Sequence, residues 1–213
     1  MRSRRQQHRA SRRSHACVWQ ALPVAGLLVA SQSLAQAGDA GVSTASPAHS
    51  GASGTFELHS VALRPSHDVP HAQVYNKGGC SGSNHSPDLS WRNAPPGTKG
   101  FAVTVFDPDA PGRGWWHWAV ASIPVNVHQL PANASASGFL KSIGAIEARN
   151  DYGDDGYGGP CPPAGSAHRY IVTVWALRTQ DLRLAAGRPA AMFEHEISVA
   201  ALAAARIIVT YTR

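Results

Sequence analysis

Apolar and β-branched residues in this chain come in short runs that end at Pro, Gly or Asp. The runs that read as β-strands are residues 100–106, 117–123, 169–177 and 207–211. Residues 198–205 are rich in Ala and Leu, which favour a helix, so a helix is predicted there before the last strand. The pattern therefore predicts a domain built mainly from strands.

The connections between these strands favour the same class of fold. The connection formed by residues 124–168 is long and rich in Gly and Pro, and strands and helices do not alternate regularly along the chain. No internal repeat is visible. We expect a mainly β domain with a few peripheral helices, rather than an alternating α/β fold.

The first 37 residues read as an export signal. An Arg-rich start is followed by the apolar run 21–30 and by Ala35-Gln36-Ala37, a small-x-small cleavage pattern after Ala37. The run is shorter than the ~20 residues that cross a bilayer. A buried helix or a mitochondrial transit peptide fits less well, since the apolar run is compact and no acidic residue precedes Asp39. Ser11-Arg12-Arg13 leaves the choice between general and twin-arginine export open.

The rest of the chain divides into a leader and one domain. Residues 38–54 are mostly Ala, Gly, Ser, Thr and Pro, which bury too little apolar surface to offset the entropy of ordering. Residues 55–213 have the length of a single domain with its own core. We expect the mature protein to be periplasmic or secreted, with no transmembrane segment.

The basic charge of the whole chain does not indicate nucleic-acid binding. The net charge is +6, but six of the nineteen basic residues are arginines among the first 13 residues. Cleavage after Ala37 would leave thirteen basic and thirteen acidic residues. Polyanion binding relies on excess positive charge, so no nucleic-acid partner is expected.

Cysteine usage points to a disulfide. Cys17 would leave with the signal, so Cys80 and Cys161 would remain as an even pair in an oxidising compartment. We predict that they are joined. The alternative is two free buried thiols.

Polar residues stand at the ends of the predicted strands. If the first strand stays extended past Phe106, Asp107 and Asp109 share a face with the apolar residues before them. His168 and Tyr170 share a face at the beginning of another strand, and His117 opens a third. Each piece alone also suits a turn or a half-buried side chain, but together they describe the mouth of a polar pocket.

A series of motifs in this order resembles the phosphatidylethanolamine-binding protein (PEBP) family, particularly its bacterial Raf kinase inhibitor-like branch. The motifs are Phe56-Glu57-Leu58, Gly79-Cys80, Ser86-Pro87-Asp88-Leu89-Ser90-Trp91, Ala94-Pro95-Pro96-Gly97-Thr98-Lys99, Asp107-Pro108-Asp109-Ala110-Pro111, Gly114-Trp115-Trp116-His117-Trp118, Asn150-Asp151-Tyr152-Gly153, Tyr157-Gly158-Gly159-Pro160-Cys161-Pro162-Pro163 and His168-Arg169-Tyr170. The resemblance covers nearly all of the predicted domain.

The resemblance implies a fold and a binding site. The fold would be a large central antiparallel sheet with a smaller flanking sheet and a few helices, with a small anion-binding cavity at one end. Carried over by position, the ligand-binding residues are Asp107, Asp109, Pro111, His117, Gly159, Pro163, His168 and Tyr170. The family's ligands are phosphoryl head groups and similar small anions. No cofactor and no metal are expected.

Two aspartates beside an anion would repel it unless nearby groups compensate. Our hypothesis is that Asp107 and Asp109 accept hydrogen bonds from His117 or His168, which would raise the histidine pKa and hold the other ring N–H towards the ligand. Tyr170 and loop N–H groups would add donors. Anion affinity would then weaken as the pH rises through the histidine pKa.

Three classes of function fit these residues. A binding protein that holds a phosphoryl-bearing ligand, with regulation of a partner protein left open, is our prediction. A metal-assisted Asp/His hydrolase is an alternative, although no Gly-x-Ser-x-Gly nucleophile is present, so no catalytic residue is predicted. The other alternative is a protease or kinase inhibitor that acts through its surface. The identity of the ligand and the oligomeric state, including a homodimer, are left open.

Overall fold

The structure is a computed structural model, and it describes residues 54–65 and 67–213. The predicted export signal 1–37 and nearly all of the predicted leader 38–54 lie outside the described residues. Within the described part of the chain, no helix is long and apolar enough to span a membrane.

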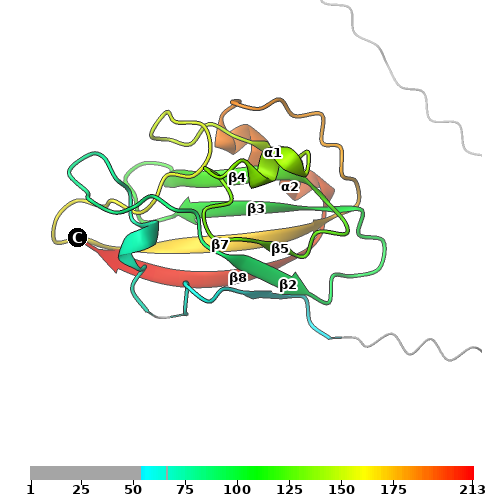
Figure 1. The fold of residues 1–213 in the computed structure, drawn as a ribbon, viewed down its shortest axis with the longest axis horizontal. Helices are drawn as coiled ribbons and strands as arrows, with labels where there is room; N and C mark the ends of the chain where they lie inside the picture. Colours follow the sequence, from blue (N-terminus) through cyan, green and yellow to red (C-terminus); the bar gives the residue numbers. More distant parts are fainter. Residues whose placement is uncertain (1–53, 66) are drawn as a thin grey trace, which may run out of the picture. The chain divides into compact units, whose positions relative to one another are not determined.

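Two antiparallel sheets form the domain (Figure 1). The smaller sheet has the strand order β1-β2-β5, and the larger has the order β6-β4-β3-β7-β8. The elements are β1 Glu57–His59, the 3-10 helix η1 His71–Gln73, β2 Leu89–Arg92, β3 Gly100–Asp107, β4 Trp115–Pro124, β5 Gln129–Leu130, α1 Phe139–Ser142, β6 Ile146–Glu147, β7 Ala167–Leu177, α2 Ala190–Ala200 and β8 Ala201–Thr212. This architecture confirms the predicted mainly β class with few helices.

The central strand β3 of the large sheet is buried on both faces because its side chains alternate between two cores. On one face, Phe101, Val103 and Val105 of β3 pack with Leu89 and Trp91 of the smaller sheet. Figure 1 shows β2 and β5 lying over β7 and β8 on this side. Successive side chains of a strand point to opposite faces, so each sheet position contributes to one core only.

The other face of the large sheet is covered by α2. Ala102 of β3 and Ala119 of β4 present small side chains there, and Phe193 and Ile197 of α2 pack against this second core. Small residues on the strands allow the helix to approach the sheet closely. The two cores hold β3, β4 and β7 from both faces, so the ends of these strands form a rigid base for a site.

The prediction of a helix over residues 198–205 is wrong. The helix ends at Ala200, and β8 runs from Ala201. Ala201–Ala205 pair with β7 in an antiparallel ladder, which satisfies their backbone groups and overrides the helix propensity of Ala. Helix α2, which begins at Ala190, was not predicted.

Candidate functional site

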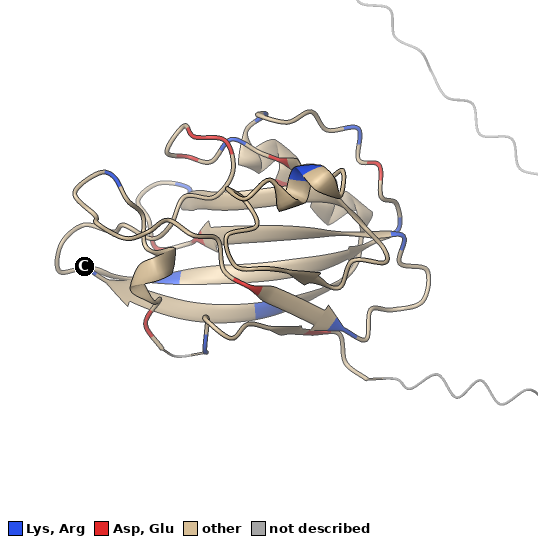
Figure 2. Cartoon of the chain, viewed as in Figure 1, with Lys and Arg blue, Asp and Glu red and all other residues tan. Residues whose placement is uncertain are grey.

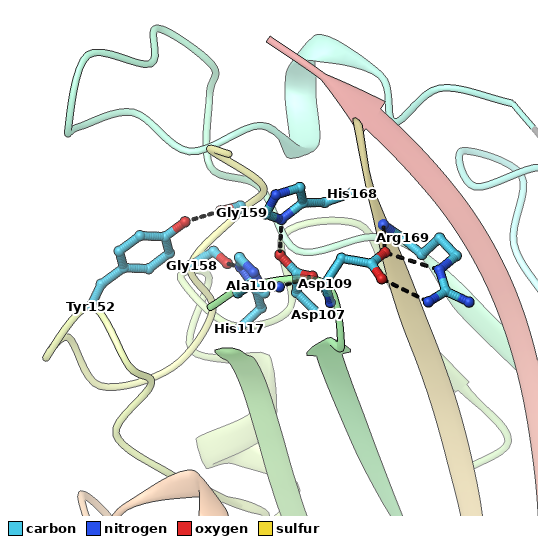
Figure 3. Close-up of polar contacts among 9 residues, drawn as sticks. All are labelled: Asp107, Asp109, Ala110, His117, Tyr152, Gly158, Gly159, His168 and Arg169. Carbon is cyan, nitrogen blue, oxygen red and sulfur yellow. Dashed lines mark hydrogen bonds and ion pairs between the residues drawn. The ribbon is translucent and has the colours of Figure 1, made fainter. Parts of the chain in front are cut away.

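A cavity of about 200 Å³ opens where β3 ends and where β4 and β7 begin. Antiparallel pairing places these strand ends side by side, with Asp107 of β3 opposite Trp115 of β4. The lining comprises Asp107, Ala110, Pro111, Trp115, His117, Tyr152, Cys161, Pro162, Pro163, His168 and Tyr170. Figure 3 shows the polar contacts at the base of this site.

Asp107 is buried, with 3% of its surface exposed, and its carboxylate organises the cavity. Oδ1 accepts the backbone N–H groups of Asp109 and Ala110, at 2.8 and 3.1 Å. Oδ2 lies 2.7 Å from Nδ1 of His168, which is also buried. A carboxylate can only accept, so His168 carries its proton on Nδ1. This contact agrees with the predicted Asp–His pairing for one of the two histidines.

Asp109 does not line the cavity, contrary to the expected shared face with Asp107. The strand ends at Asp107, and the Asp107 side chain caps the turn that follows. The Asp109 carboxylate points away to Arg169, accepting from Nε at 2.9 Å and Nη2 at 2.6 Å (Figure 3). Hydrogen bonds from this guanidinium and from the Arg169 backbone N–H lower the pKa of Asp109 to about 2.

His117 also departs from the expected arrangement. Its Nδ1 lies 2.6 Å from the carbonyl oxygen of Gly158 and not beside an aspartate. Only 2% of the residue is exposed, and burial lowers its pKa, the opposite of the expected direction for this ring. A carbonyl only accepts, so Nδ1 carries the proton and a neutral ring leaves Nε2 with a free lone pair.

Three side chains of the lining carry buried polar atoms without a partner in the protein. They are Nε1 of Trp115, Nε2 of His117 and the hydroxyl of Tyr170. Burial raises the pKa of the Tyr170 phenol above its ordinary value, so it remains a hydroxyl that can donate. Unpaired buried polar groups are uncommon in proteins, and three in one cavity mark it as a site for a polar ligand or for water.

One wall of the cavity is formed by Cys161, Pro162 and Pro163, at the end of the loop that begins at Gly158. Gly159 lies behind this wall and is not part of the lining: its N–H donates to Asn84 Oδ1 at 2.7 Å. A Cβ on Gly159 would overlap the backbone carbonyl of Gln73, so only glycine fits this close approach. The structure joins Cys161, which does line the cavity, to Cys80 in the predicted disulfide.

Tyr152 forms another part of the wall and was not predicted. Its ring stacks on Tyr75 with centroids 3.9 Å apart and meets Trp115 edge-on at 5.3 Å. Its hydroxyl donates to the carbonyl of Gly159 at 3.0 Å. These contacts fix the ring as a rigid apolar surface.

No Lys or Arg lines the cavity. Figure 2 shows the basic residues of the described chain dispersed over strands and loops instead of gathered at one end. Within residues 54–65 and 67–213, no group of three or more His, Cys, Asp or Glu side chains has an arrangement that could hold a metal ion. Any anion in this cavity would therefore depend on donors other than Lys and Arg side chains.

Of the predicted ligand-binding residues, the structure brings six to the cavity. They are Asp107, Pro111, His117, Pro163, His168 and Tyr170, whereas Asp109 and Gly159 lie outside its lining. The other lining residues, which were not among the predicted ligand-binding residues, are Ala110, Trp115, Tyr152, Cys161 and Pro162. All five fall within the motifs that carry the family resemblance, and their place in these motifs was the only indication in the sequence that they could line the site.

Known proteins share both the sequence and the fold of this chain. Over 159 residues the chain is 40% identical to the Escherichia coli UPF0098 protein YbcL, a match that covers 73% of this chain and 87% of YbcL. It is also 40% identical to E. coli YbhB over 158 residues, covering 74% of this chain and all of YbhB. The putative lipoprotein LppC of Mycobacterium tuberculosis is 35% identical over 133 residues, which is 62% of each chain.

The structural comparison agrees with the sequence comparisons. The crystal structure of E. coli YbcL, described as a member of the mammalian PEBP family, matches with a TM-score of 0.72 and 39% identity, covering 74% of this chain and 98% of YbcL. A sequence profile described as phosphatidylethanolamine-binding protein matches residues 64–212. Together, these matches and the shared two-sheet fold show that the chain belongs to the phosphatidylethanolamine-binding protein family.

Proposed function

We propose that this protein is an exported binding protein that holds a small phosphoryl-bearing or other anionic ligand in the cavity at the ends of β3, β4 and β7. The observation that carries the proposal is the set of unpaired polar atoms on Trp115, His117 and Tyr170, which line one cavity. The indole N–H and the phenol O–H are donors without acceptors. Anionic oxygens would satisfy them.

The shape of the site supports a small ligand. About 200 Å³ accommodates a tetrahedral head group with a short substituent, and not a large molecule. Ala110, Pro111, Trp115, Tyr152 and the two prolines Pro162 and Pro163 give the mouth an apolar rim. A compact polar group with a short apolar attachment therefore matches the cavity best.

Three observations support export. The first 37 residues have the pattern of an export signal. The Cys80–Cys161 disulfide belongs to an oxidising compartment. LppC, one of the relatives, is described as a putative lipoprotein, which is consistent with a place in the cell envelope.

Substitution of Tyr170 by Phe tests the binding function. The Tyr170 hydroxyl has no partner in the protein, so we expect Tyr170→Phe to leave the free energy of unfolding unchanged or slightly higher. Its affinity for phosphoethanolamine should fall about tenfold or more, since a hydrogen bond to an anion contributes ~1.5–3 kcal/mol. Calorimetric titration near pH 5.5 measures the affinity, and thermal unfolding measures the stability.

Tyr157→Phe is a matched control. Tyr157 is also buried, but it lies outside the cavity lining and its hydroxyl donates to the carbonyl of Gln73 at 2.9 Å. This variant should lose about 1 kcal/mol of stability and keep its affinity. If Tyr170→Phe binds phosphoethanolamine as tightly as the unmodified protein, the ligand does not use this cavity as proposed.

A further inference from the structure

The hydrogen-bonding of His117 limits what can occupy the cavity. Nδ1 is committed as a donor to the Gly158 carbonyl, and Nε2 has no partner. With the ring neutral, Nε2 is an acceptor and needs a donor from the ligand. A fully deprotonated phosphate has only acceptors, so it would place an oxygen lone pair against the nitrogen lone pair.

The charge of the lining sets a second limit. Asp107 contributes a carboxylate, and no Lys or Arg of the lining offsets it. The Asp107 carboxylate would repel a dianion at close range more strongly than a monoanion. Both limits are met by a ligand that keeps one acidic proton.

We infer that the cavity takes its phosphoryl ligand as the monoprotonated monoanion, with the P–OH group of the ligand donating to Nε2 of His117. The remaining phosphoryl oxygens accept from the Trp115 indole N–H and the Tyr170 hydroxyl. The unpaired buried atoms of the lining, two donors and one acceptor, then match two acceptors and one donor on the ligand. This inference rests on the proposed function and adds to it the protonation state that the site selects.

The surroundings of His117 keep this polarity fixed. The charged or titratable groups that face the ring are Asp107 at the end of β3, His168 and Tyr170 on β7, and Asp151 and Tyr152 on the loop before Gly158. Asp107 already accepts from His168, and Asp151 accepts the backbone N–H of Trp116 at 2.8 Å. Neither carboxylate makes a hydrogen bond to His117, and burial of the ring outweighs their attraction for a proton.

Methyl phosphate and methyl sulfate provide a matched pair of probes. Near pH 5 both are tetrahedral monoanions of similar size, but only methyl phosphate carries an O–H. We expect calorimetry at that pH to show methyl phosphate binding at least about tenfold more tightly than methyl sulfate. Above the second pKa of a phosphate monoester, ~6, the affinity for methyl phosphate should fall about tenfold per pH unit, and that for methyl sulfate should stay level. Equal affinities near pH 5 would overturn the inference.

A second probe separates the proton of the ligand from a protein histidine. Methylphosphonate has a higher second pKa than methyl phosphate, so the pH at which its affinity begins to fall should move upwards with it. A midpoint that is the same for both ligands would assign the titration to a group of the protein and would overturn the inference. If no probe binds at any pH, the proposed function itself fails, whereas tight binding of methyl sulfate would leave it standing.

His117→Asn tests the assigned acceptor directly. The Asn amide can still donate at the position of Nδ1, but it offers no acceptor at the position of Nε2. We expect this variant to lose most of the preference for methyl phosphate over methyl sulfate. If a folded His117→Asn protein keeps the full preference for methyl phosphate, His117 Nε2 is not the acceptor of the ligand proton. If the variant does not fold, the comparison of the two ligands on the unmodified protein still tests the inference.

Discussion

Replacing Asp107 by Ala is expected to lower the free energy of unfolding by about 3–5 kcal/mol and to abolish measurable binding of small anions. The cost is expected because each buried donor that loses its acceptor costs about 1–3 kcal/mol. Asp107 accepts the backbone N–H groups of Asp109 and Ala110 as well as the ring N–H of His168. The substitution leaves all three donors without a partner and releases the turn that carries Pro111 into the cavity wall.

Asp109→Ala is the matched control, because it removes a carboxylate only two residues away from Asp107. Asp109 pairs with the exposed Arg169, and ion pairs at exposed positions contribute little to stability. Urea unfolding of both variants, with calorimetric titration of phosphoethanolamine, measures the contrast. Similar losses of stability in the two variants would contradict the organising role assigned to Asp107.

Removal of the disulfide is expected to have an effect of comparable size. Cys80 and Cys161 are 81 residues apart in the sequence, and closing a loop of this length stabilises the folded state by up to about 4.5 kcal/mol in the chain-entropy account. The double variant Cys80→Ser and Cys161→Ser should lose stability towards that limit. Because Cys161 lines the cavity, the affinity of the double variant for phosphoethanolamine should fall as well.

Reductant gives an independent measurement of the same bond. Mass spectrometry of the exported protein should show a gain of two hydrogens on reduction, with a matching loss of stability in urea. The double serine variant should show neither change. Two free thiols in the exported protein before reduction would show that the bond does not form in the native compartment.

The strands could be predicted from the sequence because their signal is local. Within the predicted strand 169–177, residues 170–175 form an uninterrupted run of β-branched and aromatic residues, and they lie in the middle of β7. The Ala-rich segment 198–205 misled the same reasoning, since its small side chains suit a helix but its backbone pairs with β7. Helix propensity depends on the residues of the segment itself, whereas strand pairing depends on which strand the fold places beside the segment.

Which residues line the cavity could be predicted only in part, because the lining also depends on contacts that are distant in the sequence. The shared face expected for Asp107 and Asp109 requires an extended backbone, and the chain instead turns after Asp107. Tyr152 reaches the cavity from a loop whose path no local pattern specifies, held there by its contact with Tyr75. Sequence motifs could mark these segments as important, but not which side chains enter the cavity.

The sequence by itself determined the strand-rich class of the domain, the pair of cysteines and the kinds of polar side chain at the strand ends. Only the tertiary structure decided that Asp107 is buried while Asp109 is exposed, and that His117 donates to the Gly158 carbonyl instead of an aspartate. The physical reason is distance along the chain. Asp107 meets a partner 61 residues away and His117 one that is 41 residues away, so the partners depend on how strands and loops pack and not on local sequence.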